Sequence, residues 1–137
     1  MVRARSRKGH MTQTDVFLCA AGTALVLLAA GNAHAAGNAA TGAILFNRCV
    51  ICHSNTKGAP NRNGPNLFGV VGRKAGTYPG FAYSPAMKKA GFVWTVPKLE
   101  AYLADPQKLV PGNEMPIAGI SDLQQRADIA AYLATLK

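Results

Sequence analysis

The pattern of apolar and polar residues divides the chain near residue 35. Residues 16–30 are an apolar stretch without a charged side chain, and Ala33-His34-Ala35 then offers an Ala-x-Ala cleavage site. A basic segment precedes the stretch, with Arg3, Arg5, Arg7 and Lys8. This order is typical of a secretory signal peptide. We therefore predict a cleaved signal peptide over residues 1–35 and a single domain over residues 36–137.

An uncleaved membrane anchor is the alternative reading of the same segment. The apolar stretch has about 15 residues, whereas a spanning helix needs roughly 20. Extended through Ala36, it would make a marginal span, so a membrane-tethered form stays open.

Both ends of the predicted domain carry helical signals. Asn38 can cap a helix over residues 39–48. Ser121, with Gln124 three residues later, forms a capping box that opens a final helix. This final helix has apolar residues at i, i+3, i+4 and i+7, namely Ile129, Tyr132, Leu133 and Leu136. Such a stripe must be buried, and we expect the first helix to cover it.

The middle of the domain reads as short helices and one long loop. Three helical segments are predicted: one opened by Ser84-Pro85 and ended by Gly91, one over residues 97–104 capped by Thr95, and a turn over residues 106–109. Residues 57–80 contain too many Gly and Pro for a regular element. A loop of this length indicates that it wraps around something. We predict an all-α fold in which long loops enclose a ligand.

Charge and cysteine content limit the classes of partner that the domain can bind and the side chains that can form a site. Residues 36–137 hold eleven Lys and Arg against five Asp and Glu. A basic surface suits acidic proteins, anionic lipid or nucleic acid, and export argues against nucleic acid. The same residues keep only two cysteines and one histidine.

Those three side chains form one run, Cys49-Val50-Ile51-Cys52-His53. The pattern Cys-x-x-Cys-His is the attachment signature of a c-type haem. On a helical turn, Cys49 and Cys52 can each bond one vinyl group of the porphyrin, and His53 then supplies an imidazole to the iron. A domain this small buries a limited core, so a haem would supply much of its interior. We expect the haem-free chain to be poorly folded.

Three other readings of the run are weaker. A thioredoxin-like dithiol would lie beside a strand-helix-strand pattern, which is missing around Cys49. A structural zinc site needs four ligands, and residues 36–137 offer no other Cys or His. A disulfide between Cys49 and Cys52 would leave His53 without a role.

The second axial ligand decides between electron transfer and ligand binding. One histidine cannot supply bis-histidine ligation within the chain, so Met87 and Met115 are the candidates. Met87 falls in a predicted helix and suits a core-filling role, whereas Met115 lies in the stiff segment Pro111–Pro116. Paired with His53, Met115 would raise the potential and leave no open site on the iron.

The chain resembles the class I c-type cytochromes, specifically the small soluble type shared by mitochondria and purple bacteria. The segments that carry the resemblance, in order, are 46–53, Gly64-Pro65-Asn66-Leu67, Gly72-Arg73-Lys74-Ala75-Gly76, Gly80-Phe81-Ala82-Tyr83-Ser84, Trp94-Thr95, Tyr102-Leu103, Pro111-Gly112-Asn113-Glu114-Met115 and 129–133. They cover nearly all of residues 36–137.

The resemblance implies a role for each matching position. The carbonyl of Pro65 would accept the proton of His53, and Tyr102 would lie near the sulfur of Met115, the second axial ligand. The haem propionates would be held by Arg73, Tyr83, Trp94 and Asn113. Without the resemblance, the two aromatic residues Trp94 and Tyr102 read as ordinary core, and Arg73 as a surface charge.

The surface departs from the family pattern, in which lysines surround the exposed haem edge. Positive charge remains at Arg48, Lys57, Arg62 and Lys108, the expected partner-docking residues. Non-lysine residues stand at Gln107, Glu114, Ser121 and Asp122. We therefore expect weaker electrostatic steering of acidic partners than in the mitochondrial protein.

The sequence thus predicts a monomeric, periplasmic one-electron carrier that is not an enzyme. Its partners would be a cytochrome bc complex and either a haem-copper oxidase or a photosynthetic reaction centre. The alternatives are a dedicated or membrane-tethered acceptor for a periplasmic dehydrogenase, a haem sensor or enzyme with an open sixth site, and a binding module without haem.

Overall fold

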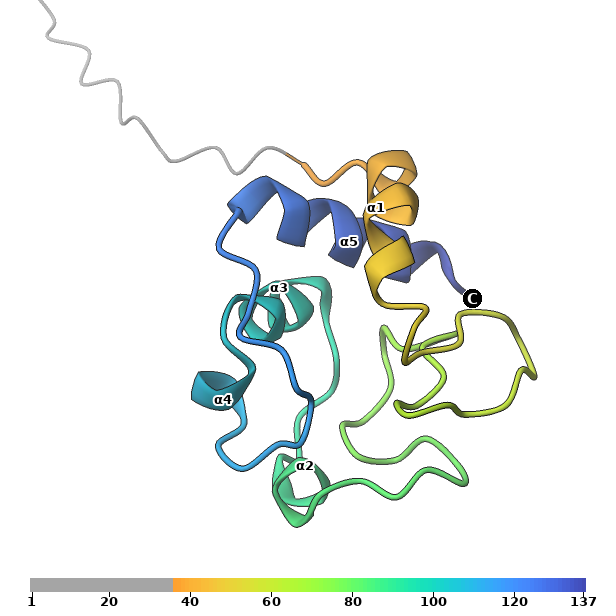
Figure 1. Ribbon diagram of the computed structural model, residues 1–137, viewed down its shortest axis with the longest axis vertical. Helices are drawn as coiled ribbons and strands as arrows, with labels where there is room; N and C mark the ends of the chain where they lie inside the picture. Colours follow the sequence, from red (N-terminus) through yellow and green to blue (C-terminus); the bar gives the residue numbers. More distant parts are fainter. Residues whose placement is uncertain (1–35) are drawn as a thin grey trace, which may run out of the picture. The chain divides into compact units, whose positions relative to one another are not determined.

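The computed structural model describes residues 36–137, so the predicted signal peptide lies outside the described residues. The elements in chain order are α1 (Ala39–Leu45), the 3-10 turn η1 (Phe46–Arg48), α2 (Pro85–Lys89), α3 (Val96–Ala104), α4 (Pro106–Leu109) and α5 (Leu123–Thr135) (Figure 1). This region contains no β-strand, only an isolated antiparallel bridge between Lys74 and Val93. The predicted all-α fold is confirmed.

Helices α1, α2 and α3 begin at the capping residues that the sequence predicts. Asn38 accepts hydrogen bonds from the N–H groups of Ala40 and Thr41 at the start of α1. Ser84 caps α2, and Thr95 caps α3, which begins one residue earlier than expected. Each cap satisfies an N–H that has no partner inside its helix. These starts were predictable because capping depends on residues two or three positions away.

The start of α5 differs from the prediction. Asp122, not Ser121, is the capping residue, and its carboxylate accepts the N–H of Gln125 at 3.0 Å. A carboxylate binds these N–H groups more strongly than a hydroxyl and also favours the positive end of the helix dipole. Hydrogen bonding to the backbone of Gln125 accordingly lowers the pKa of Asp122. Gln124, expected in a capping box, instead donates to the carboxylate of Asp128 at 2.8 Å.

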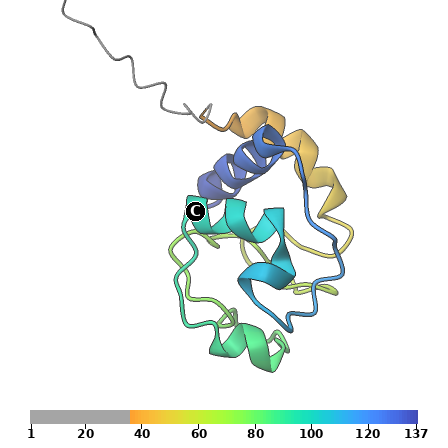
Figure 2. The same cartoon turned by 90° about the vertical axis from the view of Figure 1, so that its left-hand side faces the viewer.

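The first and last helices pack directly against each other, as expected (Figures 1 and 2). Gly42 is the point of closest approach, since an added Cβ there would overlap the backbone carbonyl of Asp128. The rings of Phe46 and Tyr132 lie 5.3 Å apart between their centroids. Phe46 and Ile129 are each 1% exposed, so this contact forms one end of the core.

Substituting alanine at Gly42 should therefore destabilise the protein, by about 2 kcal/mol. Alanine would favour an isolated helix over glycine by roughly 1 kcal/mol. Overpacking costs about 1–3 kcal/mol or more, and here the obstacle is a backbone carbonyl that cannot rotate away. Urea unfolding of the haem-bound protein would measure the difference.

The control for Gly42→Ala is Ala40→Gly, at an exposed position of the same helix. It should cost no more than the propensity difference of about 1 kcal/mol. A Gly42→Ala protein at least as stable as the unchanged one would show that α1 and α5 are not packed this closely.

Helix α3 packs on α5 and extends the core that α1 and α5 form. Its buried face consists of Leu99, Tyr102 and Leu103. No helix among residues 36–137 is long and apolar enough to cross a membrane. Residues 49–83 contain no helix and lie below α1 and α5 in Figure 1. The predicted long loop is thus present, and it borders the candidate site.

Candidate functional site

The Cys-x-x-Cys-His run forms a helical turn directly after η1. The N–H of Cys49 donates to the carbonyl of Phe46 at 2.7 Å, and the N–H of His53 donates to the carbonyl of Cys49 at 2.9 Å. Cys52 bonds to the same carbonyl of Cys49 at 3.0 Å. Both thiols are free and partly buried. The turn thus holds two thiols and an imidazole together on a short, rigid segment.

The surroundings of this turn give no support to a redox dithiol or a zinc site. Burial raises the pKa of Cys49, and neighbouring Arg48 offsets this only in part. Catalytic dithiols instead need a thiol with a lowered pKa. No group of three His, Cys, Asp or Glu side chains within residues 36–137 could hold a metal ion.

The imidazole of His53 is held by a backbone carbonyl. Its Nδ1 lies 2.7 Å from the carbonyl oxygen of Pro65. Because a carbonyl only accepts, Nδ1 carries the proton and Nε2 keeps a free lone pair. Gly64 lies so close that an added Cβ would overlap the ring. Burial lowers the pKa of His53, which favours the neutral imidazole that a metal requires.

Asn66 holds this loop in place, a role that the sequence analysis did not assign. Its exposed fraction is 0%. The side-chain amide donates to the carbonyls of Thr56 and Ala59, each at 2.8 Å, and its oxygen accepts the N–H of Phe68 at 2.8 Å. These bonds close the loop around Pro65 and so position the carbonyl that orients His53. An amide directly after Gly-Pro in a loop was the available signal.

The methionine loop is organised by Asn113, which is 6% exposed. Its side-chain oxygen accepts the N–H of Met115 at 3.0 Å and the hydroxyl of Tyr102 at 3.1 Å. Its side-chain NH₂ donates to the carbonyl of Val110 at 3.0 Å. Burial raises the pKa of Tyr102 to about 12, so its hydroxyl stays protonated and can donate. The structure thus brings Tyr102, Asn113 and Met115 together.

The two candidate methionines occupy different environments. Met87 is 8% exposed and belongs to the hydrophobic core, in line with the core-filling interpretation. Met115 is partly buried and packs against that core from a non-helical loop. Met115 is therefore held by backbone and side-chain hydrogen bonds of its loop, whereas Met87 is held by helix α2.

Arg73 is not the surface charge that the residues alone suggested. Its guanidinium donates to the carbonyls of Asn66 at 3.0 Å and Phe68 at 3.2 Å. It also lies over the ring of Tyr78, 4.5 Å from the centroid. Burial is the main cause that lowers its pKa. A partly buried cation of this kind suits a buried anionic group.

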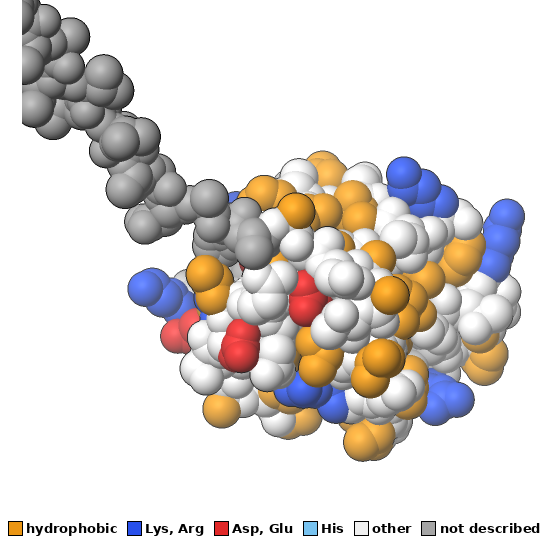
Figure 3. Space-filling view, turned by 90° about the horizontal axis from the view of Figure 1, so that it is seen from above, with side chains coloured by type: hydrophobic (Ala, Val, Ile, Leu, Met, Phe, Trp, Pro, Cys, Tyr) orange, Lys and Arg blue, Asp and Glu red, His pale blue; other side chains and the backbone are white. Residues whose placement is uncertain are grey.

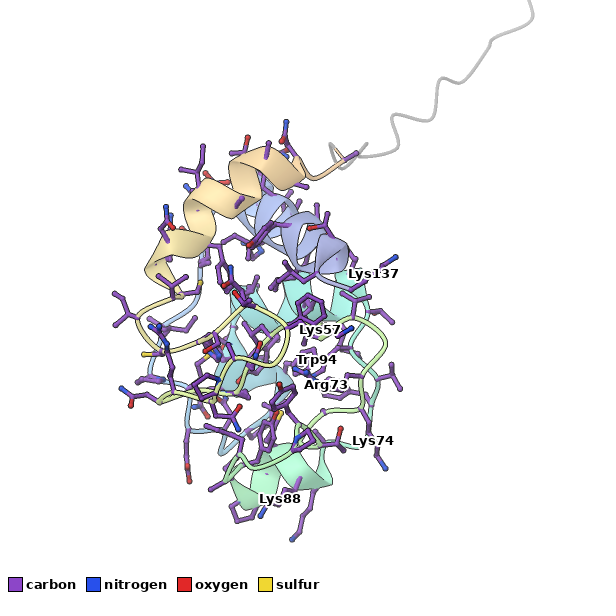
Figure 4. The ribbon with its side chains drawn as sticks, turned by 90° about the vertical axis from the view of Figure 1, so that its right-hand side faces the viewer. Lys57, Arg73, Lys74, Lys88, Trp94 and Lys137 are labelled. Atoms are coloured by element: carbon purple, nitrogen blue, oxygen red, sulfur yellow. The ribbon has the colours of Figure 1, made fainter. Side chains whose placement is uncertain are left out.

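Two aromatic residues, Trp94 and Tyr83, lie near Arg73. The backbone N–H of Trp94 donates to the backbone carbonyl of Arg73 at 2.9 Å, and Figure 4 shows the two residues near each other in the middle of the view. The ring of Trp94, 8% exposed, contacts that of Tyr102 at 5.1 Å. Burial raises the pKa of Tyr83, and Arg73 opposes the rise. Arg73 and Tyr83 are therefore close enough to act on one group.

These residues fit a covalently attached haem. They offer two thiols on one turn, an imidazole with a free Nε2, a thioether, and a partly buried cation that lies over a tyrosine ring. Gly64 lies directly against the imidazole ring of His53. This contact and the bond from Nδ1 to Pro65 together fix the orientation of the ring. The haem supplies an iron that gains and loses one electron reversibly.

The expected docking residues are all exposed, in different surroundings. Arg62 donates to the carbonyl of Val50 at 2.8 Å, which places it against the Cys-x-x-Cys-His turn. Arg48 donates to Gln125 on α5 at 3.1 Å. Lys57 is exposed in the long loop, and Lys108 is exposed on α4.

Charge is unevenly distributed along residues 36–137. Within residues 36–137, no Asp or Glu occurs before Glu100, and the five acidic residues of this range lie from Glu100 to Asp128. Figure 3 looks onto the surface near α1 and α5, where acidic side chains gather on one side and Lys and Arg project around the margin. The turn carrying His53 therefore lies in the purely basic part of the chain, and Met115 in the mixed part.

Known proteins match this chain over the whole described region. The Cytochrome c family model matches residues 39–137. A cytochrome c2 from Rhodopila globiformis is 50% identical over 102 residues, covering 74% of this chain and 95% of the relative. A cytochrome c2 from Blastochloris viridis is 44% identical over 110 residues, covering 80% and 87%.

A solved structure agrees with these relatives. Cytochrome cH from Methylobacterium extorquens is 47% identical, with a TM-score of 0.68, covering 72% of this chain and 99% of that one. The fold, the Cys-x-x-Cys-His turn and the relatives lead to one assignment. The chain belongs to the cytochrome c family, as a class I c-type electron carrier of the purple-bacterial and mitochondrial kind, and its cofactor is a covalently bound haem c.

Proposed function

We propose that the protein is a periplasmic one-electron carrier whose haem iron is bound by His53 and Met115. Cys49 and Cys52 form the thioether links. The observation that carries the proposal is the bond from His53 Nδ1 to the carbonyl of Pro65, because it fixes the ring and leaves Nε2 for iron.

This ligand pair accounts for electron transfer without bond chemistry. A thioether is a neutral, soft ligand, so a His/Met pair raises the potential. With both axial positions filled, no site remains for oxygen or peroxide, and the protein catalyses no reaction of its own. Ligands held by rigid loops stay in place in both oxidation states, which keeps reorganisation small.

Proton NMR of the reduced protein tests the ligand assignment. A methionine methyl group bound to the iron lies over the porphyrin and should give resonances shifted strongly upfield. Met115→Leu should abolish these resonances, whereas Met87→Leu should retain them. Loss of the signal in the Met87 variant alone would assign the sulfur to Met87 instead.

The haem propionates are the anions that Arg73, Tyr83, Trp94 and Asn113 would bind. Arg73 supports this by its partial burial and by its closeness to Trp94. Asn113 already uses its oxygen twice and one side-chain N–H, so a single N–H remains for a propionate.

We place the mature chain at residues 36–137, exported and monomeric. The apolar stretch is short for a spanning helix, and Ala33-His34-Ala35 supplies a cleavage site. Intact mass measurement of the exported protein distinguishes this domain plus haem from a retained chain of 137 residues plus haem. The retained mass would favour the tethered alternative.

The donor would be a cytochrome bc complex, and the acceptor a haem-copper oxidase or a photosynthetic reaction centre. The cytochrome c2 relatives support this choice. Reduction and oxidation rates with each isolated complex, and with periplasmic dehydrogenases, would identify the physiological pair. Fast reduction by one dehydrogenase alone would favour the dedicated-acceptor alternative.

Arg62→Ala should slow association with an acidic redox partner by roughly two- to fivefold at low salt. Arg62 contacts the carbonyl of Val50 beside the haem-attachment turn, in a segment of the domain that holds no Asp or Glu before Glu100. The difference should vanish at high salt because exposed charges are screened. Stopped-flow kinetics at several salt concentrations would measure it.

Lys88→Ala is the matched control for Arg62→Ala. It removes the same charge from α2, at the opposite end of the described domain from α1 (Figure 4). Its rate should stay close to that of the unchanged protein. An equal effect of both variants would mean that net charge, and not docking at the turn, controls the rate.

A further inference from the structure

The side chain of Gln107 holds the methionine loop with both atoms of its amide. Its Nε2 donates to the backbone carbonyl of Asn113 at 2.8 Å. Its Oε1 accepts the backbone N–H of Gly112 at 3.1 Å. Gly112 has φ of +85°, so these bonds close a left-handed turn just before Met115.

Gln107 lies in a helix that is itself held in place by a cap and by packing. This helix is α4, which begins at the buried Pro106 and is capped by Asp105, whose carboxylate accepts the N–H of Lys108 at 3.0 Å. Helix α4 in turn packs against α3. The amide of Gln107 therefore connects the loop to the helical part of the fold and not to another loop.

The loop side of the connection leads directly to the sulfur ligand. Gln107 binds the carbonyl of Asn113, and the side chain of Asn113 accepts the N–H of Met115. The hydroxyl of Tyr102 donates to the same Asn113 oxygen. The exposed Gln107 thus holds the backbone carbonyl of Asn113, and the buried Tyr102 holds its side-chain oxygen.

We propose that Gln107 is a positioning residue that keeps the Met115 sulfur on the haem iron by resisting opening of residues 111–116. This inference rests on Met115 being the axial ligand. One of these two hydrogen bonds is partly buried and the other is exposed. Their loss should increase the population of the open loop by roughly tenfold.

The chemistry requires an amide at this position. The amide of glutamine has an NH₂ group that donates and an oxygen that accepts, and the loop presents one acceptor and one donor. Glutamate keeps only the acceptor for Gly112, and lysine keeps only a donor for Asn113. Gln107→Glu and Gln107→Lys therefore each retain one bond, a different one in each case.

Two measurements on the haem-bound ferric protein test the proposal. Imidazole enters only when the loop is open, so its apparent affinity reports the open fraction. Gln107→Ala should raise this affinity roughly tenfold, with smaller increases for Gln107→Glu and Gln107→Lys. Amide hydrogen exchange at Gly112 should accelerate strongly in the Ala and Lys variants, which lose its acceptor, and only slightly in the Glu variant, which keeps it.

The control is Asn63→Ala, which removes an exposed amide from a different loop. It should change neither the imidazole affinity nor the exchange at Gly112. Thermal unfolding of each variant confirms that the fold is intact, as expected for an exposed side chain.

Unchanged imidazole affinity in Gln107→Ala, in a protein that shows the sulfur-to-iron NMR signal, would overturn the positioning role alone. An equal increase in the Asn63 control would also overturn it. Absence of the sulfur signal in the unchanged protein would instead refute the proposed Met115 ligation, and this role with it.

Discussion

Replacing Met115 with alanine should open the sixth coordination position of the iron. The reduced variant should bind carbon monoxide at neutral pH, whereas the unchanged protein should not bind it appreciably. The potential should fall by on the order of 0.2 V, a fraction of the roughly 0.8 V range that axial ligands span. Carbon monoxide difference spectra and redox titration would measure both effects.

Met87→Leu is the control for the loss of the thioether. Met87 fills the core and is 8% exposed, so a volume-conserving substitution should leave the iron closed and the potential nearly unchanged. Ready carbon monoxide binding by the unaltered protein would favour the haem sensor or enzyme with an open site. The prediction therefore separates the two functional classes.

Removing both attachment cysteines should abolish cooperative folding. We expect the Cys49→Ala/Cys52→Ala chain, which has no covalent haem, to lose most of its helical far-ultraviolet signal and its sharp thermal transition. Residues 49–83 contain no helix and their ordering costs conformational entropy of about 1–2 kcal/mol per residue. A small helical core cannot offset that cost without the apolar surface of the haem.

Ile51→Ala is the matched control for haem removal. Ile51 lies between the two cysteines and is 74% exposed, so its loss should leave haem attachment and thermal unfolding nearly unchanged. A Cys49→Ala/Cys52→Ala chain with the same helical signal and the same sharp transition as the haem-bound protein would contradict the prediction. The haem would then occupy a preformed cavity and would not complete the core.

Local signals predicted the helices well. The caps at Asn38, Ser84 and Thr95 were predictable because a capping side chain binds an N–H only two or three residues away. The predicted cap of α5 was wrong by one residue, because two neighbouring residues can both cap a helix. Ser121 and Asp122 are both good caps, and the carboxylate forms the stronger bond.

Long-range hydrogen bonds were much harder to predict. Asn66 and Gln107 are polar residues in or near loops, where most amides bind water. The Gly-Pro before Asn66 was a signal for a role in the loop but did not show that Asn66 is fully buried, and nothing near Gln107 shows that it binds the backbone of the methionine loop. Both roles depend on how distant turns come together in the folded chain.

The sequence by itself determined the haem chemistry, because Cys49, Cys52 and His53 are adjacent and one helical turn is enough to assemble them. It also determined the helical segments, whose caps and apolar spacing are local. The family resemblance also named the carbonyl of Pro65 as the partner of His53. Only the tertiary structure decided how deeply Arg73 is buried and which side chain secures the loop of Met115. The bonds of Arg73 and Gln107 reach five to seven positions along the chain, across turns whose course depends on the packing of the whole domain.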